Sequence, residues 1–179
     1  MAQASTLYRF KIELSDVDRS VYETLNFRLA MHPSEAEAFF LTRVLAYVLN
    51  YGEGISFTDG LSTPDLPSIQ IVGTNGEILT WIDIGNPTAR RLHKASKAAR
   101  KVRIYTYKNP ENLKNEAAGE KIHRADEIEI SGLDFKFLTD VGLALKRDNV
   151  WGLIHNEGEI VITAGEKTFI GSLTPHRLI

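Results

Sequence analysis

Apolar and polar residues alternate along the first thirty positions of the chain. Phe10, Ile12 and Leu14 are separated by charged residues, and a second alternating run covers residues 20–30 after the polar stretch SDVDRS. A period of two places the apolar residues on one face of a β-strand. The pattern predicts an N-terminal hairpin of strands 5–14 and 20–30 with one buried face.

The spacing changes to that of a helix after residue 33. Apolar residues recur three and four positions apart from Phe40 to Leu49, and Ser34 followed by Glu37 forms a capping-box sequence. These signals predict a helix that begins at Ser34 and ends at Gly52 or Gly54.

Three short strands are expected next. ISF at 55–57 precedes a breaker-rich stretch, and the strands SIQIV and EILTWIDI flank Gly73-Thr74-Asn75-Gly76. Since Asn-Gly is a strong hairpin signal, the latter two strands are expected to pair in antiparallel fashion.

A β-α-β unit follows. Asn86 and Pro87 suit the N-cap and first position of a helix whose narrow apolar face holds Leu92, Ala95 and Ala99, and VRIYTY is the next strand. Strands joined in this way are parallel.

The residue pattern in the last third of the chain predicts a helix at 110–118, a strand at 127–130, a helix at 133–147 and a terminal hairpin at 150–164. The elements together predict a mixed α/β fold (α+β), a mixed sheet flanked by helices, in a single domain of residues 1–179 with extra N-terminal and C-terminal hairpins.

The composition of the chain excludes several kinds of site and indicates a cellular location. The chain has no cysteine, which excludes disulfides, thiolate zinc sites and cysteine catalysis. It has no apolar run of 18 residues and no signal-peptide pattern at its start, so we expect a cytoplasmic location and no membrane partner.

Charge is unevenly distributed. Residues 84–110 contain eight Lys or Arg and no acid, whereas the rest of the chain holds 13 basic and 23 acidic residues. Such a patch is commonly one solvated helix face, but it also fits nucleic acid bound through the basic segment 90–103.

Three acidic residues occupy distinctive places in this order of elements. Glu35 falls in the first turn of the expected helix, Asp65 follows a proline at a strand start, and Asp83 interrupts an apolar strand. From Ser34 the order helix, three strands, helix, strand resembles the PD-(D/E)XK, restriction-endonuclease-like fold, with the core at about residues 33–108.

That resemblance implies a divalent-metal-dependent nuclease or phosphodiesterase. A phosphodiester is shielded by its own charge, so its hydrolysis needs a cation on the phosphoryl oxygen and an activated water. By the resemblance Asp65 and Asp83 bind Mg²⁺ or Mn²⁺, which prefer carboxylate oxygens, and Glu35 assists through water.

The lysine of the motif is missing. It should stand two residues after Asp83, where this chain has Gly85. Lys94 on the following helix is a candidate replacement that would position the nucleophile, and Arg91 is a second. Arg90, Arg91 and Lys97 are the expected phosphate-binding residues.

The chain also resembles the YaeQ family of bacterial proteins. The stretches that carry the likeness run in order from the N-terminus to residue 107: TLYRFKIELSDVDRSVYE, LAMHPSE, FTDGLST, GEILTWIDIGNPTARRLHKA and VRIYTY. By motif position the resemblance places the family's acids on Glu35, Asp65 and Asp83, and its basic helix residues on Arg91 and Lys94.

This chain differs from the family's usual sequence in one segment. Where the family often reads Asp-Glu-Pro-Asp-Leu-Trp, the chain has Asp65-Leu66-Pro67-Ser68-Ile69-Gln70. The first acidic position is therefore either Asp65 or the place taken by Ser68.

Simpler roles exist for each acid. Asp65 could cap a turn, Glu35 could face a helix dipole, and Asp83 could form a buried salt bridge with Arg91 or Arg43. The alternative to a nuclease is accordingly a catalytically inactive binding or regulatory protein on the same fold. The substrate, DNA or RNA, and the oligomeric state stay open.

Overall fold

The computed structural model describes residues 4–60 and 63–179. Its residues cluster into two compact units. We call the residues up to Val44 together with Leu133–Leu173 the N-terminal unit, and Leu45–Gly132 together with Thr174–Ile179 the central unit. Helix α1 (Glu37–Leu49) and strand β10 (Lys167–Arg177) each contribute residues to both.

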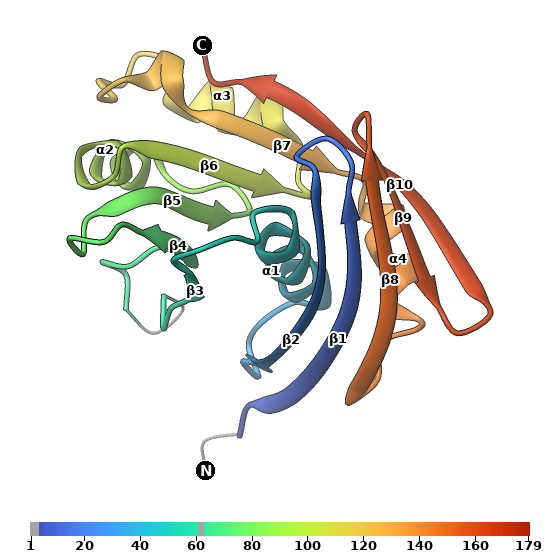
Figure 1. Cartoon of the computed structure of the whole chain (residues 1–179). Helices are drawn as coiled ribbons and strands as arrows, with labels where there is room; N and C mark the ends of the chain where they lie inside the picture. The colour runs from blue at the N-terminus through green and yellow to red at the C-terminus, as the bar shows by residue number, and fades with distance from the viewer. Residues whose placement is uncertain (1–3, 61–62) are drawn as a thin grey trace. The chain divides into compact units, whose positions relative to one another are not determined.

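The N-terminal unit is built on long strands in the order β2-β1-β8-β9-β10 (Figure 1). β1 pairs antiparallel with β2 and parallel with β8, and the β8–β9 and β9–β10 pairs are antiparallel. The alternating residues Phe10, Ile12 and Leu14 are buried, as the pattern predicted. The bounds are β1 (Thr6–Asp16), β2 (Val21–Met31), α4 (Phe135–Gly142), β8 (Asp148–Asn156) and β9 (Glu159–Ala164).

The central unit carries the strand order β7-β6-β5-β4-β3. The β3–β4 and β4–β5 pairs are antiparallel, and β5, β6 and β7 are parallel to one another. The bounds are β3 (Ile55–Phe57), β4 (Ile69–Val72), β5 (Ile78–Ile84), α2 (Ala89–Ala98), β6 (Lys101–Thr106), α3 (Pro110–Ala117), the 3₁₀ turn η1 (Ala125–Glu127) and β7 (Glu129–Leu133).

Helix α2 is fixed to this sheet by its narrow apolar side. Leu92 and Ala95 are buried in a cluster that includes Trp81 of β5 and Ile104 of β6. Arg124 closes the far end of the helix, where its guanidinium donates to the carbonyl oxygens of residues 96, 99 and 100. A cation at a helix C-terminus is favourable because the carbonyl oxygens there carry partial negative charge. One side of α2 is thus held on the core and the other faces solvent.

The expected fold class is confirmed at the level of a mixed α/β fold with a mixed sheet flanked by helices, and the β-α-β unit is confirmed with β5 parallel to β6. Its assignment to the PD-(D/E)XK class, and the single domain, stay predictions. Within the described residues no helix is long and apolar enough to cross a membrane.

Both expected helix starts before residue 90 were wrong. α1 begins at Glu37, not after Ser34, because the Ser34 hydroxyl contacts the His32 ring and caps no helix. α2 begins at Ala89 with Thr88 as the N-cap, since the Asn86 side chain instead bonds Thr106 and the carbonyl of residue 109.

The C-terminal third also differs in its bounds. The helix expected at 133–147 ends at Gly142, and the strand expected at 127–130 is displaced to Glu129–Leu133 by η1. The terminal hairpin is followed by a third strand, β10, which the sequence pattern did not predict. Apolar and polar residues alternate too irregularly in this segment to indicate a strand.

Two glycines of the central unit provide a matched test of how closely its strands approach one another. Gly54 and Gly76 both have positive φ, of 83° and 80°. A Cβ at Gly54 would lie 2.3 Å from the Val72 carbonyl oxygen. A Cβ at Gly76 would have no described heavy atom within 4 Å outside residues 75–77.

We therefore expect Gly76→Ala to lose about 1 kcal/mol from backbone strain alone. Gly54→Ala should lose at least about 3 kcal/mol, because the β3–β4 hairpin must also move apart. Thermal melts of the two variants measure the difference, and equal losses would contradict the close approach at Gly54.

Candidate functional site

Asp83 lies buried near the end of β5 and forms an ion pair with Arg91 of α2. Arg91 Nε is 2.6 Å from one carboxylate oxygen, and a terminal guanidinium nitrogen is 2.9 Å from the other. Asp83 is only 2% exposed. A charge this deeply buried is tolerated when it is paired and hydrogen-bonded, and of the two salt-bridge partners considered for Asp83, the structure has Arg91.

The same guanidinium holds the chain that precedes β4. Arg91 donates to the carbonyl oxygens of Pro64, at 2.6 Å, and Leu66, at 2.7 Å. The Ser68 backbone N–H donates to Asp83 at 3.2 Å, so Ser68 acts through its amide. We call these contacts of Asp83, Arg91 and residues 64–68 the Asp83–Arg91 clamp.

Two further contacts orient Arg91. The Thr88 hydroxyl accepts the Arg91 backbone N–H at 3.2 Å and fixes the first turn of α2. The guanidinium carbon lies 5.5 Å from the centre of the Trp81 ring, within the range of a cation–π contact. Arg91 is therefore held between β5, α2 and the 64–68 segment and is not displayed for a ligand.

Asp65 and Lys94 form a second pair beside the clamp. The Lys94 ammonium donates a hydrogen bond to the Asp65 carboxylate and thereby lowers the pKa of that group. The side chains are 47% exposed for Lys94 and 77% for Asp65, so solvent screens the attraction and the pair contributes little stability. Lys94 is paired with Asp65, whereas the nuclease motif needs it beside Asp83.

Glu35, the third predicted acid, belongs to the N-terminal unit. Its carboxylate forms a two-pronged pair with Arg43 at 2.7 and 2.8 Å and accepts the His32 N–H at 3.0 Å. Arg43 also donates to the Ala30 carbonyl oxygen on β2. Glu35 precedes α1, so its expected place in a helical first turn was wrong, and its carboxylate serves to join β2 to the helix.

The metal expected from the resemblance does not fit these side chains as they stand. Asp83 already accepts three N–H donors, and Lys94 occupies Asp65. Nowhere in residues 4–60 and 63–179 do three His, Asp or Glu side chains form a group that could hold a metal ion. A cation at Asp83 would have to share the carboxylate with Arg91, whose positive charge would repel it.

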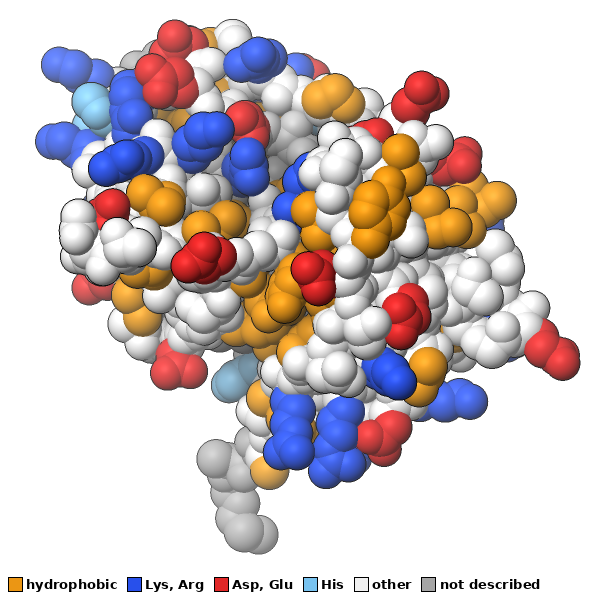
Figure 2. All heavy atoms as spheres, in the orientation of Figure 1, with side chains coloured by type: hydrophobic (Ala, Val, Ile, Leu, Met, Phe, Trp, Pro, Cys, Tyr) orange, Lys and Arg blue, Asp and Glu red, His pale blue; other side chains and the backbone are white. Residues whose placement is uncertain are grey.

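The basic residues divide into internal and outward ones. Arg91 and Lys94 are paired as described, whereas Arg90, Lys97 and Lys101 are exposed and make no ion pair with any described residue. Figure 2 shows Lys and Arg side chains gathered at the upper left, over the region of α2. Of the three predicted phosphate-binding residues, Arg90 and Lys97 are thus available to a ligand.

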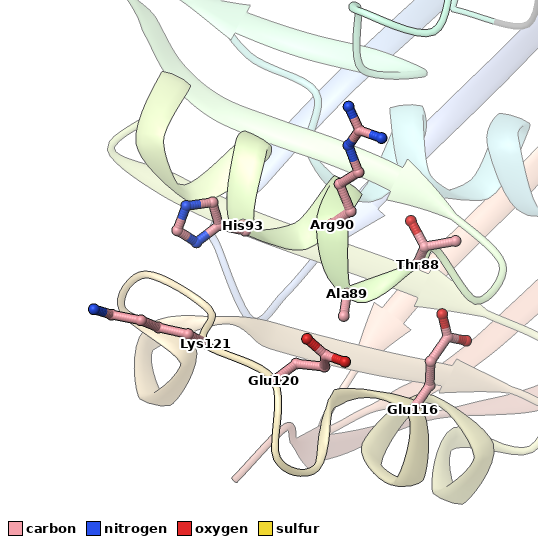
Figure 3. A pocket seen from close by; sticks show the side chains of 7 residues that line it. All are labelled: Thr88, Ala89, Arg90, His93, Glu116, Glu120 and Lys121. Carbon is pink, nitrogen blue, oxygen red and sulfur yellow. The ribbon is translucent and has the colours of Figure 1, made fainter.

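Sequence reasoning missed a pocket beside the first turn of α2. It measures about 380 Å³, and its polar lining comes from Thr88, Arg90, His93, Glu116, Glu120 and Lys121 (Figure 3). The signal available was weak: Glu116 and Glu120 are four residues apart, and α3 ends between them at Ala117. Only the fold brings them to α2.

A second polar cluster lies in the N-terminal unit, at the polar stretch SDVDRS between the first two predicted strands. Asp16 is fully buried and contacts the His155 ring at 3.0 Å and Arg19 at 2.7 Å. Asp18 accepts the backbone N–H of Glu157, which lowers the pKa of Asp18. These contacts fasten the end of β1 to the end of β8.

The clamp gives a direct stability test. In Asp83→Asn the Arg91 guanidinium keeps its burial but loses its counter-charge, and we expect a loss of roughly 3 kcal/mol, or about 6–12 °C in Tm. Asp65→Asn removes the exposed acid beside it and should shift Tm by no more than about 2 °C. A wild-type Tm for Asp83→Asn would contradict the clamp.

Comparisons with known proteins agree on the family. A family model described as YaeQ protein matches residues 1–172. The proteins named "Uncharacterized protein YaeQ" from Escherichia coli K12 and Shigella flexneri are each 34% identical over 107 residues, which is 60% of this chain and 59% of theirs. The match thus spans less than two thirds of these relatives, whose names supply no activity.

Two crystal structures extend the likeness along the chain. YaeQ protein from Xanthomonas axonopodis pv. citri aligns with a TM-score of 0.89 and 26% identity, over 97% of this chain and 99% of that one. YaeQ protein from Pseudomonas syringae aligns with a TM-score of 0.87 and 28% identity, over 97% of both chains. The chain belongs to the YaeQ family.

Proposed function

We propose that this protein binds the phosphate backbone of nucleic acid on the exposed surface of α2 and does not hydrolyse it. The observation that carries the proposal is the Asp83–Arg91 clamp. Both oxygens of the one buried acid that a metal would need are bonded to N–H donors of the protein itself. This is the binding alternative to the nuclease.

The charge distribution supports a local polyanion-binding surface. Arg90, Lys97 and Lys101 are exposed without ion-pair partners in the described chain, and residues 84–110 contain no acid. Because acids outnumber bases in the rest of the chain, attraction to a polyanion should be strongest at this surface. Phosphate contacts of this kind bind DNA and RNA alike and weaken steeply with salt. A cytoplasmic location belongs to the same proposal.

A metal-dependent nuclease is the second candidate, and one observation favours it. Asp65, Asp83, Lys94 and Arg91, all named by the resemblance, lie in one network of contacts within the central unit. An active enzyme would bind Mg²⁺ or Mn²⁺ at Asp83 against the positive charge of Arg91, unless the clamp opens.

The binding proposal predicts a specific salt dependence. Fluorescence anisotropy with labelled single strands should give a linear fall of log affinity with log salt. The triple variant Arg90→Gln, Lys97→Gln, Lys101→Gln removes the three exposed cations that make no ion pair with a described residue. The slope should fall by about 2, since each phosphate contact contributes about 0.7 for single strands.

The control removes the same charge from the N-terminal unit, in Lys11→Gln, Arg28→Gln, Lys167→Gln. These side chains are exposed, and their loss should leave the slope within about 0.5 of wild type. Equal effects of the two triple variants would mean that binding depends only on the net charge of the protein. That result would contradict a binding surface on α2.

Calorimetric titration with Mn²⁺ separates the two candidates. We expect no stoichiometric binding by the wild type and no cleavage of labelled DNA or RNA in the presence of the ion. One bound ion that disappears in a folded Asp83→Ala variant, and weakens in Asp65→Asn, would favour the nuclease instead. Thermal melts of each variant verify folding.

A further inference from the structure

The pocket beside α2 combines two carboxylates with cations at its rim. Glu116 and Glu120 extend toward the first turn of α2, near Thr88 and Ala89, while His93 and Lys121 lie at the other end (Figure 3). The Arg90 guanidinium points away from the two glutamates. No contact of Glu116 or Glu120 with another described side chain fixes either carboxylate.

The orientation of His93 is fixed. Its Nδ1 accepts the backbone N–H of His123 at 3.1 Å, so a neutral ring carries its proton on Nε2. His93 presents an N–H donor and a flat aromatic face, and the Ala89 methyl adds apolar surface.

This lining is unsuited to phosphate. Two carboxylates repel an anion, yet they accept hydrogen bonds from N–H groups. Arg90 belongs both to the pocket rim and to the exposed basic surface of α2. A ligand that joins an anionic group to a flat group rich in N–H donors matches this arrangement, and a nucleotide has both parts.

We propose that the pocket receives one unpaired base of a single-stranded nucleic acid, with guanine preferred. This inference rests on the proposed function, which supplies the phosphate contacts along α2. The volume of about 380 Å³ lies within the range of roughly 300–1,000 Å³ typical of ligand pockets.

Guanine is preferred for a chemical reason. Its Watson–Crick edge offers N1–H and N2–H₂ side by side, which fit the two oxygens of one carboxylate. Adenine and cytosine offer an amino group without the adjacent ring N–H, and uracil offers a single N–H. A base in a duplex has this edge occupied, so single strands are bound in preference to duplexes.

The test compares short oligouridine strands that carry guanosine, adenosine or uridine at one central position, by anisotropy at fixed salt. We expect the guanosine strand to bind about tenfold more tightly than the all-uridine strand. In Glu116→Gln, Glu120→Gln this ratio should fall to about 1, although affinity for every strand rises with the loss of negative charge.

The matched control is Glu53→Gln, Glu111→Gln, which changes the net charge equally at two exposed residues outside the pocket and should keep the tenfold ratio. Equal binding of all strands by the wild type, or a ratio that survives the pocket variant, overturns the base pocket and leaves the proposed function standing. Absence of any binding overturns both.

Discussion

The central unit depends on keeping one buried carboxylate neutralised. Asp83 is placed by a strand whose last five residues are all buried, so it cannot reach water, and an uncompensated charge there would oppose folding. Arg91 resolves this, and because a guanidinium has five donors, it also bonds two carbonyl oxygens of the 64–68 segment. One side chain thus sets the position of α2 on the sheet and of the segment beside it.

This arrangement places paired, structural residues and exposed, unpaired residues on different sides of a single helix. Leu92 and Ala95 face the core, and Arg91 points toward Asp83 as part of the clamp. Arg90 and Lys97 face solvent. Basic residues adjacent in the sequence therefore have unlike roles, since successive positions on a helix point about 100° apart. Arg91 is part of the fold, whereas Arg90 and Lys97 carry exposed positive charge.

Periodicity predicted much of the fold, because the strands that alternate strictly, such as β1, and the turn at Asn75-Gly76 are determined locally. The helix starts failed where distant partners competed: Asn86 bonds Thr106, so Thr88 takes over the cap. The same limit applied to the site. Asp83 and Arg91 were both identifiable, and their pairing was one of two alternatives. The contact of the Ser68 amide with Asp83 and the position of Glu116 beside α2 depend on tertiary structure alone.

The parallel pairing of β1 with β8 has a consequence for how the protein is made. Asp16 and His155 meet although 139 positions separate them, so β1 leaves the ribosome long before its second neighbour exists. Until then the edge of β1 that pairs with β8 has no partner strand. Of the rings that pack on Phe10 in the fold, Phe40 of α1 has been made by then but Trp151 of β8 has not. Closure over such a separation is slow, so this edge of β1 is open to pairing with other chains until residues 148–156 have been made.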